Sequence, residues 1–343
     1  MNERLQAETE RLRRSWERHD AAMLRDYLVS DVEDPRLNVQ SILSRHFVAQ
    51  ALFGDRFAGL CEQELRFAGV LSWLRRWLKD AGEAEDFVAL RHALRQGSDN
   101  VEGLEIPRFV SGSFATLPTR ADGVEIPNYL DRMFSRPEPG NPVLPEGALA
   151  TFQSLWQTAL WEEMPTELSV LEPACGSAND YRFLEACGLA RWVRYTGLDL
   201  CEKNVVNARA LFPAARFEMG NVLDIQAPEK TYDLCLVHDL FEHLSPEAME
   251  AAVGEVCRVT RRGLCVGFFN MHEAPEPLIR PVEEYHWNTL SVPVMRSLFE
   301  RHGFATQVVH IGTFLRWRFG CGETHNDHAY TFIGSAAPVP SQV

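Results

Sequence analysis

The stretch that decides the fold is Leu168-Ser-Val-Leu-Glu-Pro-Ala-Cys-Gly-Ser-Ala-Asn-Asp180. Its apolar start predicts a short buried strand at 168–171. The small residues at 174–178 predict a turn whose backbone passes close to a ligand. Because ligands of open α/β sheets bind at the carboxyl ends of the strands, this turn is the first candidate for a binding site.

Short apolar strands and helices alternate after that turn. Further strands are predicted at 193–198, 216–219, 234–237 and 264–268, with helices notably at 203–211 and 246–259. A helix at 291–302 ends at Gly303, and two last strands near 304–314 and 328–334 are expected to form an antiparallel hairpin. Such alternation indicates parallel βαβ units. We therefore expect an α/β fold with a Rossmann-like, doubly wound, mostly parallel sheet and an antiparallel last strand.

The first half of the chain differs from the second half in its amino-acid pattern. The first 100 residues contain one proline, and apolar residues recur at helical spacing within 57–78, whereas seven of the 19 prolines lie between 101 and 150. We expect a helical N-terminal domain at 1–110, which acts as a lid or a dimerisation surface. A Pro-rich connecting or lid segment with a helix follows at 111–165, and the α/β domain spans 166–337.

Composition narrows the class of protein. The net charge of −14 argues against nonspecific binding of nucleic acid, which depends on basic patches. No apolar run approaches the length of a membrane helix, and the charged start of the chain has no signal-like apolar core. The eight cysteines form no C-x-x-C pair, so neither a zinc ribbon nor a dithiol motif is predicted. We expect a cytoplasmic protein that binds neither nucleic acid nor a membrane.

An acid at the end of the second strand indicates a nucleoside ligand. Asp199 lies 23 residues after Gly176, and an acid about 20 residues beyond such a loop accepts hydrogen bonds from ribose hydroxyls. A dinucleotide fold would have G-x-G-x-x-G, but those positions are Ala174, Gly176 and Asn179. No P-loop is present either, so phosphate binding is not predicted.

These stretches together resemble the class I S-adenosylmethionine-dependent methyltransferases. Glu172-Pro-Ala-Cys-Gly-Ser-Ala178 is similar to their first motif, with alanines at 174 and 178 where glycines are usual. Asp199 stands at the ribose position, and Gly220-Asn-Val222 follows the third strand. Tyr232–Leu244 looks like their fourth strand and its turn, and Leu298–Phe304 like a late helix-to-strand join. The resemblance covers about 166–337.

The resemblance implies S-adenosylmethionine as cofactor and S-adenosylhomocysteine as product. Leu200 and Val222 would flank the adenine, and Asn221 would accept from its amino group. The alternative for Glu172 and Asn179 is that they satisfy local backbone groups, Asn179 as a helix N-cap. The implied cofactor residues are Glu172, Ala174, Cys175, Gly176, Asn179, Asp199, Leu200, Asn221, Val222 and His238.

Catalytic and acceptor residues are expected after the fourth and fifth strands. His243 is the candidate general base. The alternative is that His243 and Glu242 are only a pair of surface residues without a catalytic role. The candidate acceptor contacts are Tyr285, His286, Trp287 and Asn288, together with Tyr129 of the Pro-rich segment. The aromatic ones could cage a cation, or could instead cap the sheet edge. The loop Cys321–His328 is expected to be a polar hairpin loop, and no metal site is expected.

The expected activity is methyl transfer to a small molecule of specialised metabolism. Two alternatives remain, a non-catalytic module that binds the cofactor as a sensor or scaffold, and a nicotinamide-dependent oxidoreductase. The helical N-terminal domain could also join two copies of the chain into a homodimer.

Overall fold

The computed structural model describes residues 2–26, 39–59, 61–62, 65, 100–101, 104–105, 168–186, 188–319 and 326–336. The Pro-rich segment at 111–165 with Tyr129, most of the apolar stripe within 57–78, and residues 320–325 of the His-rich loop lie outside these ranges.

A seven-stranded sheet forms the centre of the C-terminal half, in the order β12-β13-β7-β6-β3-β4-β5. Strand β13 is antiparallel to both of its neighbours, and the other pairs are parallel. The doubly wound, mostly parallel sheet with an antiparallel last strand is thus confirmed. The strands are β3 (Leu168–Pro173), β4 (Val193–Asp199), β5 (Arg216–Met219), β6 (Tyr232–His238), β7 (Thr260–Phe268), β12 (Phe304–His310) and β13 (Tyr330–Ala336).

Helices cover both faces of this sheet. From β3 the chain proceeds to the neighbouring strands β4 and β5 through α9 (Asn179–Ala186) and α10 (Glu202–Leu211). From β6 it proceeds toward the opposite edge of the sheet, to β7 and β12, through α11 (Pro246–Val259) and α12 (Val292–Arg301). Right-handed crossovers in opposite directions place the two pairs of helices on opposite faces. The central strands β3 and β6 are accordingly buried along nearly their whole length, which explains their mainly apolar sequence.

The strand expected at 304–314 is wrong in its second part. β12 ends at His310, and α13 (Ile311–Phe319) begins at the next residue. The imidazole Nδ1 of His310 accepts from the backbone N–H of Thr313 at 3.3 Å, as a helix-capping side chain does. Ile311 and Leu315, four residues apart, are buried, which is a helical rather than a strand period.

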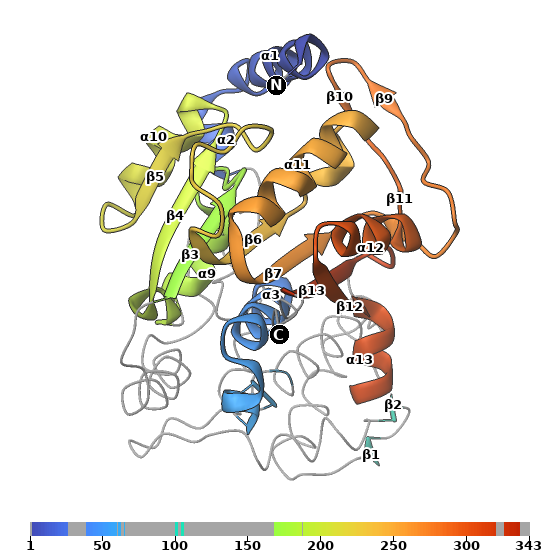
Figure 1. Ribbon diagram of the computed structural model, residues 1–343. Helices are drawn as coiled ribbons and strands as arrows, with labels where there is room; N and C mark the ends of the chain where they lie inside the picture. The colour runs from blue at the N-terminus through green and yellow to red at the C-terminus, as the bar shows by residue number, and fades with distance from the viewer. Residues whose placement is uncertain are drawn as a thin grey trace, which may run out of the picture.

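The N-terminal elements pack on the α/β domain. They are the helices α1 (Glu3–Glu17), α2 (Ala21–Asp26) and α3 (Val39–Phe53). The 3-10 turn η1 (Gly54–Phe57) follows α3, and β1 (Asn100–Val101) and β2 (Leu104–Glu105) form a short antiparallel pair. Figure 1 shows α1 at the top of the molecule, above α2 and α10 and beside β10. Leu5 and Leu12 of α1 are buried in the same core cluster as Leu244, so α1 covers one end of the sheet of its own chain.

Short elements fill the polar stretch after β7. They are β8 (Met271–His272), β9 (Pro281–Val282), β10 (Tyr285–His286) and β11 (Leu290–Ser291), and 3-10 turns occur at η2 (Leu189–Trp192) and η3 (Phe241–His243). β9 and β10 form an antiparallel hairpin, and β8 pairs with β11 in parallel. Among the described residues, no helix has both the length and the apolar composition needed to cross a bilayer.

Candidate functional site

The site lies where the direction of the strand order reverses. β3 pairs with β4 on one side and with β6 on the other, so the loops that follow β3 and β6 leave the same edge of the sheet. This is the place where open α/β sheets bind their ligands. The two loops are 174–178 and 239–244.

The loop 174–178 has an alternating left-handed backbone. Ala174, Gly176 and Ala178 have φ of 61°, 55° and 69°, respectively. The two alanines therefore adopt the conformation that glycine favours, and the departure from a glycine pattern leaves the loop geometry intact. Three backbone N–H groups of the loop are bonded within the fold: Cys175 donates to the carbonyl of Leu198, Gly176 to Asp199 and Ala178 to the carbonyl of Cys175.

Asp199, the last residue of β4, holds this loop through hydrogen bonds. Its carboxylate is buried and accepts from the backbone N–H groups of Gly176 at 2.9 Å and Cys201 at 2.8 Å. The amide of Asn204 adds a third bond at 3.1 Å. Burial raises the pKa of Asp199, and these bonds work in the opposite direction. The thiol of Cys175, a residue of this loop, is buried and donates to the carbonyl of Gly176 at 3.6 Å.

Asn179 is not the N-cap that one alternative suggested. It is the first residue of α9, and its Oδ1 is buried with no hydrogen-bond partner among the described residues. Its Nδ2 lies 3.2 Å from where a Cβ on Gly176 would stand, so the amide borders the loop. An orphaned acceptor at this position fits a ligand that brings an N–H donor.

Carboxyl groups gather beneath the loop. Glu172 is buried and accepts from the hydroxyl of Tyr195 at 2.5 Å, and burial followed by the charge of Asp180 raises its pKa well above the usual range. Asp180 pairs with Nδ1 of His238 at 2.5 Å. Burial opposes the charged imidazole, but Asp180 outweighs it and the pKa of His238 is raised. The charge of Asp180 is paired with His238, and burial raises the pKa of Glu172, so these groups give this part of the site little net charge.

The predicted adenine residues lie beside the N-terminal helix. Leu200 and Val222 are half-buried against the core cluster that includes Leu5 and Leu12. Asn221 accepts from the N–H of Leu223 at 3.0 Å and donates to the Thr9 hydroxyl at 3.1 Å. The side chain expected to face adenine is therefore already in contact with α1.

Asp239 is a site residue that sequence reasoning missed. It follows β6 directly, its φ of 52° is left-handed without being glycine, and burial raises its pKa to about 6. Non-glycine residues held in such backbone conformations cluster at functional sites. The only signal in the sequence is its position, directly after the strand that ends at His238.

His243 lies in a group of aromatic side chains, which we call the aromatic wall: His243, Phe269, Tyr285 and Trp287. Ring centroids within this wall are 5.1–5.8 Å apart, and Trp287 is 42% exposed. Nδ1 of His243 donates to the carbonyl of His286 at 3.1 Å, which leaves Nε2 with its lone pair. Burial lowers the pKa of His243, so the imidazole is neutral near pH 7.

The predicted acceptor residues thus divide into two kinds. Tyr285 and Trp287 contribute rings to the wall, and His286 contributes its backbone carbonyl. Asn288 is fully buried, donates to the carbonyl of Leu244 at 2.8 Å and accepts from the N–H of Arg280 at 3.0 Å. Its amide therefore stabilises the hairpin.

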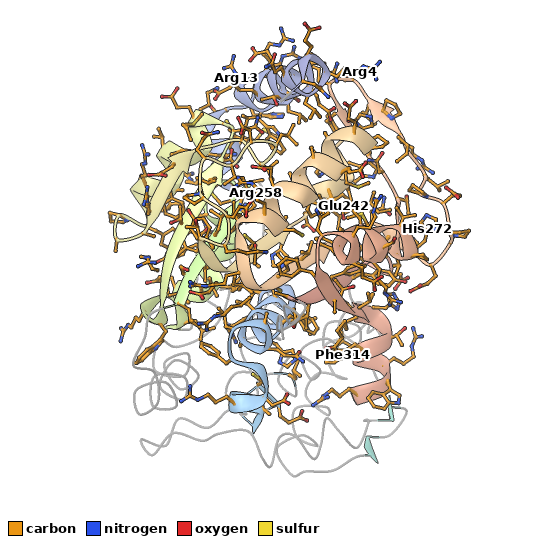
Figure 2. All side chains as sticks on the ribbon, in the orientation of Figure 1. Arg4, Arg13, Glu242, Arg258, His272 and Phe314 are labelled. Atoms are coloured by element: carbon orange, nitrogen blue, oxygen red, sulfur yellow. The ribbon has the colours of Figure 1, made fainter. Side chains whose placement is uncertain are left out.

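The N-terminal segment contacts the site at several points, none of which was predicted residue by residue. Glu8 accepts from the backbone N–H and the hydroxyl of Ser245 at 2.8 and 2.5 Å. Ser177 of the loop donates to the carbonyl of Leu24 at 3.1 Å, and Lys203 donates to the carbonyl of Glu17 at 2.6 Å. In Figure 2 the labelled Arg4 and Arg13 mark α1 at the top of the molecule. Within the described ranges, no group of three or more His, Cys, Asp or Glu residues could hold a metal ion.

Comparisons with known proteins agree with this geometry. Residues 170–263 match the family model described as "Methyltransferase domain". A probable S-adenosylmethionine-dependent methyltransferase of Mycolicibacterium smegmatis is 28% identical over 140 residues, which are 40% of this chain and 52% of that protein. The chain thus spans about half the length of the curated relative it matches.

Two methyltransferases are among the solved structures that align with part of this chain. The 1,6-didemethyltoxoflavin-N1-methyltransferase of Burkholderia thailandensis is 16% identical, with 56% of this chain and 80% of that chain covered and a TM-score of 0.38. The magnesium protoporphyrin IX methyltransferase of Synechocystis is 14% identical, with 61% and 84% covered and a TM-score of 0.37. The family match rests on residues 170–263, which contain most of β3, the loop 174–178, Asp199 and the strands β4 to β6. Residues 170–263 therefore match a methyltransferase domain, and 140 residues of the chain are similar to a probable S-adenosylmethionine-dependent methyltransferase.

Proposed function

We propose that this protein binds S-adenosylmethionine at the loop 174–178 and transfers its methyl group to a small-molecule acceptor. The observation that carries this proposal is the alternating left-handed loop, fastened to Asp199 within a domain that matches methyltransferases. When bound, the cofactor supplies an electrophilic methyl group on a sulfonium.

The residues present fit such a cofactor. The orphaned Oδ1 of Asn179 suits its amino group, and the one lone pair left on Oδ2 of Asp199 suits a ribose hydroxyl. Leu200 and Val222 offer apolar contacts to an adenine. Glu172 and Asp180 border the loop as further polar groups, and the charge of Asp180 is paired with His238.

His243 is the general base in this proposal. The carbonyl of His286 holds the hydrogen on Nδ1, so Nε2 can take a proton from an acceptor hydroxyl, amine or thiol as the new bond to the methyl carbon forms. Phe269, Tyr285 and Trp287 present ring faces and edges, which suit a small acceptor with apolar or aromatic surface. Alignment of acceptor and cofactor supplies the remaining acceleration.

The N-terminal segment closes the site in this proposal. Adjacent residues of α1 reach opposite sides, since Glu8 bonds Ser245 near the aromatic wall and Thr9 bonds Asn221 near the adenine position. We propose that residues 2–26 act as a lid, in keeping with the lid expected for 1–110. A homodimer stays a prediction, and the apolar face of α1 is already used within its own chain.

Calorimetric titration with S-adenosylmethionine, S-adenosylhomocysteine and NAD tests the proposal. We expect micromolar binding of the first two, weakened at least tenfold in Asp199→Asn and unchanged in the surface control Glu229→Gln. Binding of NAD alone would support the oxidoreductase alternative. Cofactor binding without turnover over a broad panel of hydroxyl, amine and thiol acceptors would favour a sensor or scaffold.

A further inference from the structure

Glu242 links the turn after β6 to the turn after β7. Its side chain is fully buried, and Oε1 accepts from the backbone N–H groups of Phe269 at 2.8 Å and Asn270 at 3.3 Å. Figure 2 shows Glu242 inside the fold, beside α11. The first of these two bonds fixes the backbone of a residue whose ring belongs to the aromatic wall.

The same residue also holds the segment that follows β10. The backbone carbonyl of Glu242 accepts from the N–H of Asn288 at 2.9 Å. Asn270, which the Glu242 carboxyl orients, donates through Nδ2 to the carbonyl of Asn288 at 2.9 Å. Glu242, Asn270 and Asn288 therefore form a frame that joins three separate segments.

Each member of this frame is next to a residue of the aromatic wall. Glu242 precedes His243, Asn270 follows Phe269, and Asn288 follows Trp287. His286, whose carbonyl holds Nδ1 of His243, lies two residues before Asn288. A change in the frame must therefore move the rings around His243 and the carbonyl that fixes its tautomer.

The frame uses the neutral form of the carboxyl group. Oε2 of Glu242 is buried with no hydrogen-bond partner among the described residues, so a charge there would be unsolvated. Burial, followed by the nearby Asp239, raises the pKa of Glu242 to about 8. A glutamine has the same shape and keeps an oxygen that can accept from both N–H groups.

We infer that Glu242 is a positioning residue of the acceptor site: through Phe269, Asn270 and Asn288 it holds the aromatic wall around His243 and keeps Nε2 of that imidazole available to the acceptor. The inference rests on the function proposed above, because it presumes His243 to be the base. Glu242 itself does not contact the acceptor.

The test is an NMR titration of the histidine side chains of the full chain without ligand. The signal of His243 is assigned by its loss in His243→Gln. We expect the pKa of His243 to be unchanged in Glu242→Gln and in the surface control Glu229→Gln. In Glu242→Ala it moves up toward the 6.5 of an unperturbed imidazole, because the ring becomes solvated.

A second variant keeps the test decisive if Glu242→Ala does not fold. Asn270→Ala retains the backbone N–H that Glu242 binds but removes the bond to Asn288, so the same upward shift is expected. An unchanged His243 titration in the folded alanine variants, or a shift in Glu242→Gln equal to that in Glu242→Ala, overturns the inference. Because the titration uses no cofactor, its failure is separate from a failure to bind S-adenosylhomocysteine.

Discussion

Substitution of Gly176 by alanine tests whether the left-handed loop is the cofactor site. Gly176 has a φ of 55° and lies between Ala174 and Ala178, which already hold left-handed backbones. Its backbone N–H donates to Asp199 at 2.9 Å. An alanine at 176 would make three non-glycine residues in one five-residue turn adopt this conformation.

The magnitude follows from the backbone and from one contact. A left-handed alanine costs about 1–2 kcal/mol relative to glycine. The new Cβ would stand 3.2 Å from Nδ2 of Asn179, and this flexible amide can move aside at little energetic cost. We therefore expect Gly176→Ala to lower the free energy of unfolding by ~1–2 kcal/mol. Displacement of Asn179 or of the bond to Asp199 would weaken cofactor binding by about 1.4 kcal/mol or more, which is about tenfold.

The reverse change at Ala174 is the matched control. Ala174→Gly removes a strain of ~1–2 kcal/mol, and the greater freedom of the unfolded chain offsets ~0.4–1 kcal/mol of this gain. We expect Ala174→Gly to raise the free energy of unfolding by about 0.5 kcal/mol and to leave cofactor affinity unchanged.

Urea unfolding followed by circular dichroism and calorimetric titration with S-adenosylhomocysteine measure the two effects. The reasoning is refuted if Gly176→Ala is as stable as the parent chain, or if Ala174→Gly is less stable than Gly176→Ala. If Gly176→Ala lost stability but bound the product with unchanged affinity, the loop would be strained as described but would not be the cofactor site.

Three further predictions concern groups around the site. The pairing with Asp180 raises the pKa of His238 in the folded state above the value of about 6.5 in the unfolded state. The pairing therefore stabilises the fold fully below about pH 6.5, and this stability is lost as the pH rises through the folded pKa. Asp180→Asn should accordingly flatten the pH dependence of thermal unfolding above about pH 6.5. In Gly267→Ala the new Cβ would stand 2.2 Å from Cδ2 of His238, so we expect a loss of ~1–3 kcal/mol by urea unfolding, and a parent-like value would contradict the packing. Glu8→Gln weakens the bonds to Ser245 and should accelerate dissociation of S-adenosylhomocysteine in stopped-flow measurements, whereas an unchanged rate would contradict the lid.

Much of the sheet could be predicted from the sequence because its strands are local apolar runs. β5 was predicted at its observed bounds, and β3, β4, β6 and β7 within a few residues. Parallel strands buried on both faces lack alternation but have uniformly apolar residues, which a linear reading detects. The end of β12 could not be found in this way, because the sequence from Ile311 to Leu315 suits a strand or a helix until His310 caps the latter.

The candidate site was predictable only where it coincides with strand ends. Gly176, Asp199 and His238 follow from position, since loops after parallel strands converge at one edge of a sheet. Asn179 was among the residues that the resemblance implies, but its unpartnered oxygen is a property of the folded structure, and the left-handed backbone of Asp239 is not encoded by its residue type.

By itself, the sequence determined the fold class, and it predicted the edge of the sheet at which a nucleoside-containing ligand would bind. These depend on periodicity and on spacing along short stretches of chain. Only the tertiary structure decided that two alanines adopt the left-handed conformation and that Glu242 frames the aromatic wall. It also decided that Thr9 reaches Asn221, 212 residues away. Such features arise from contacts between distant segments, and the packing of those segments selects one of several conformations that each residue allows alone.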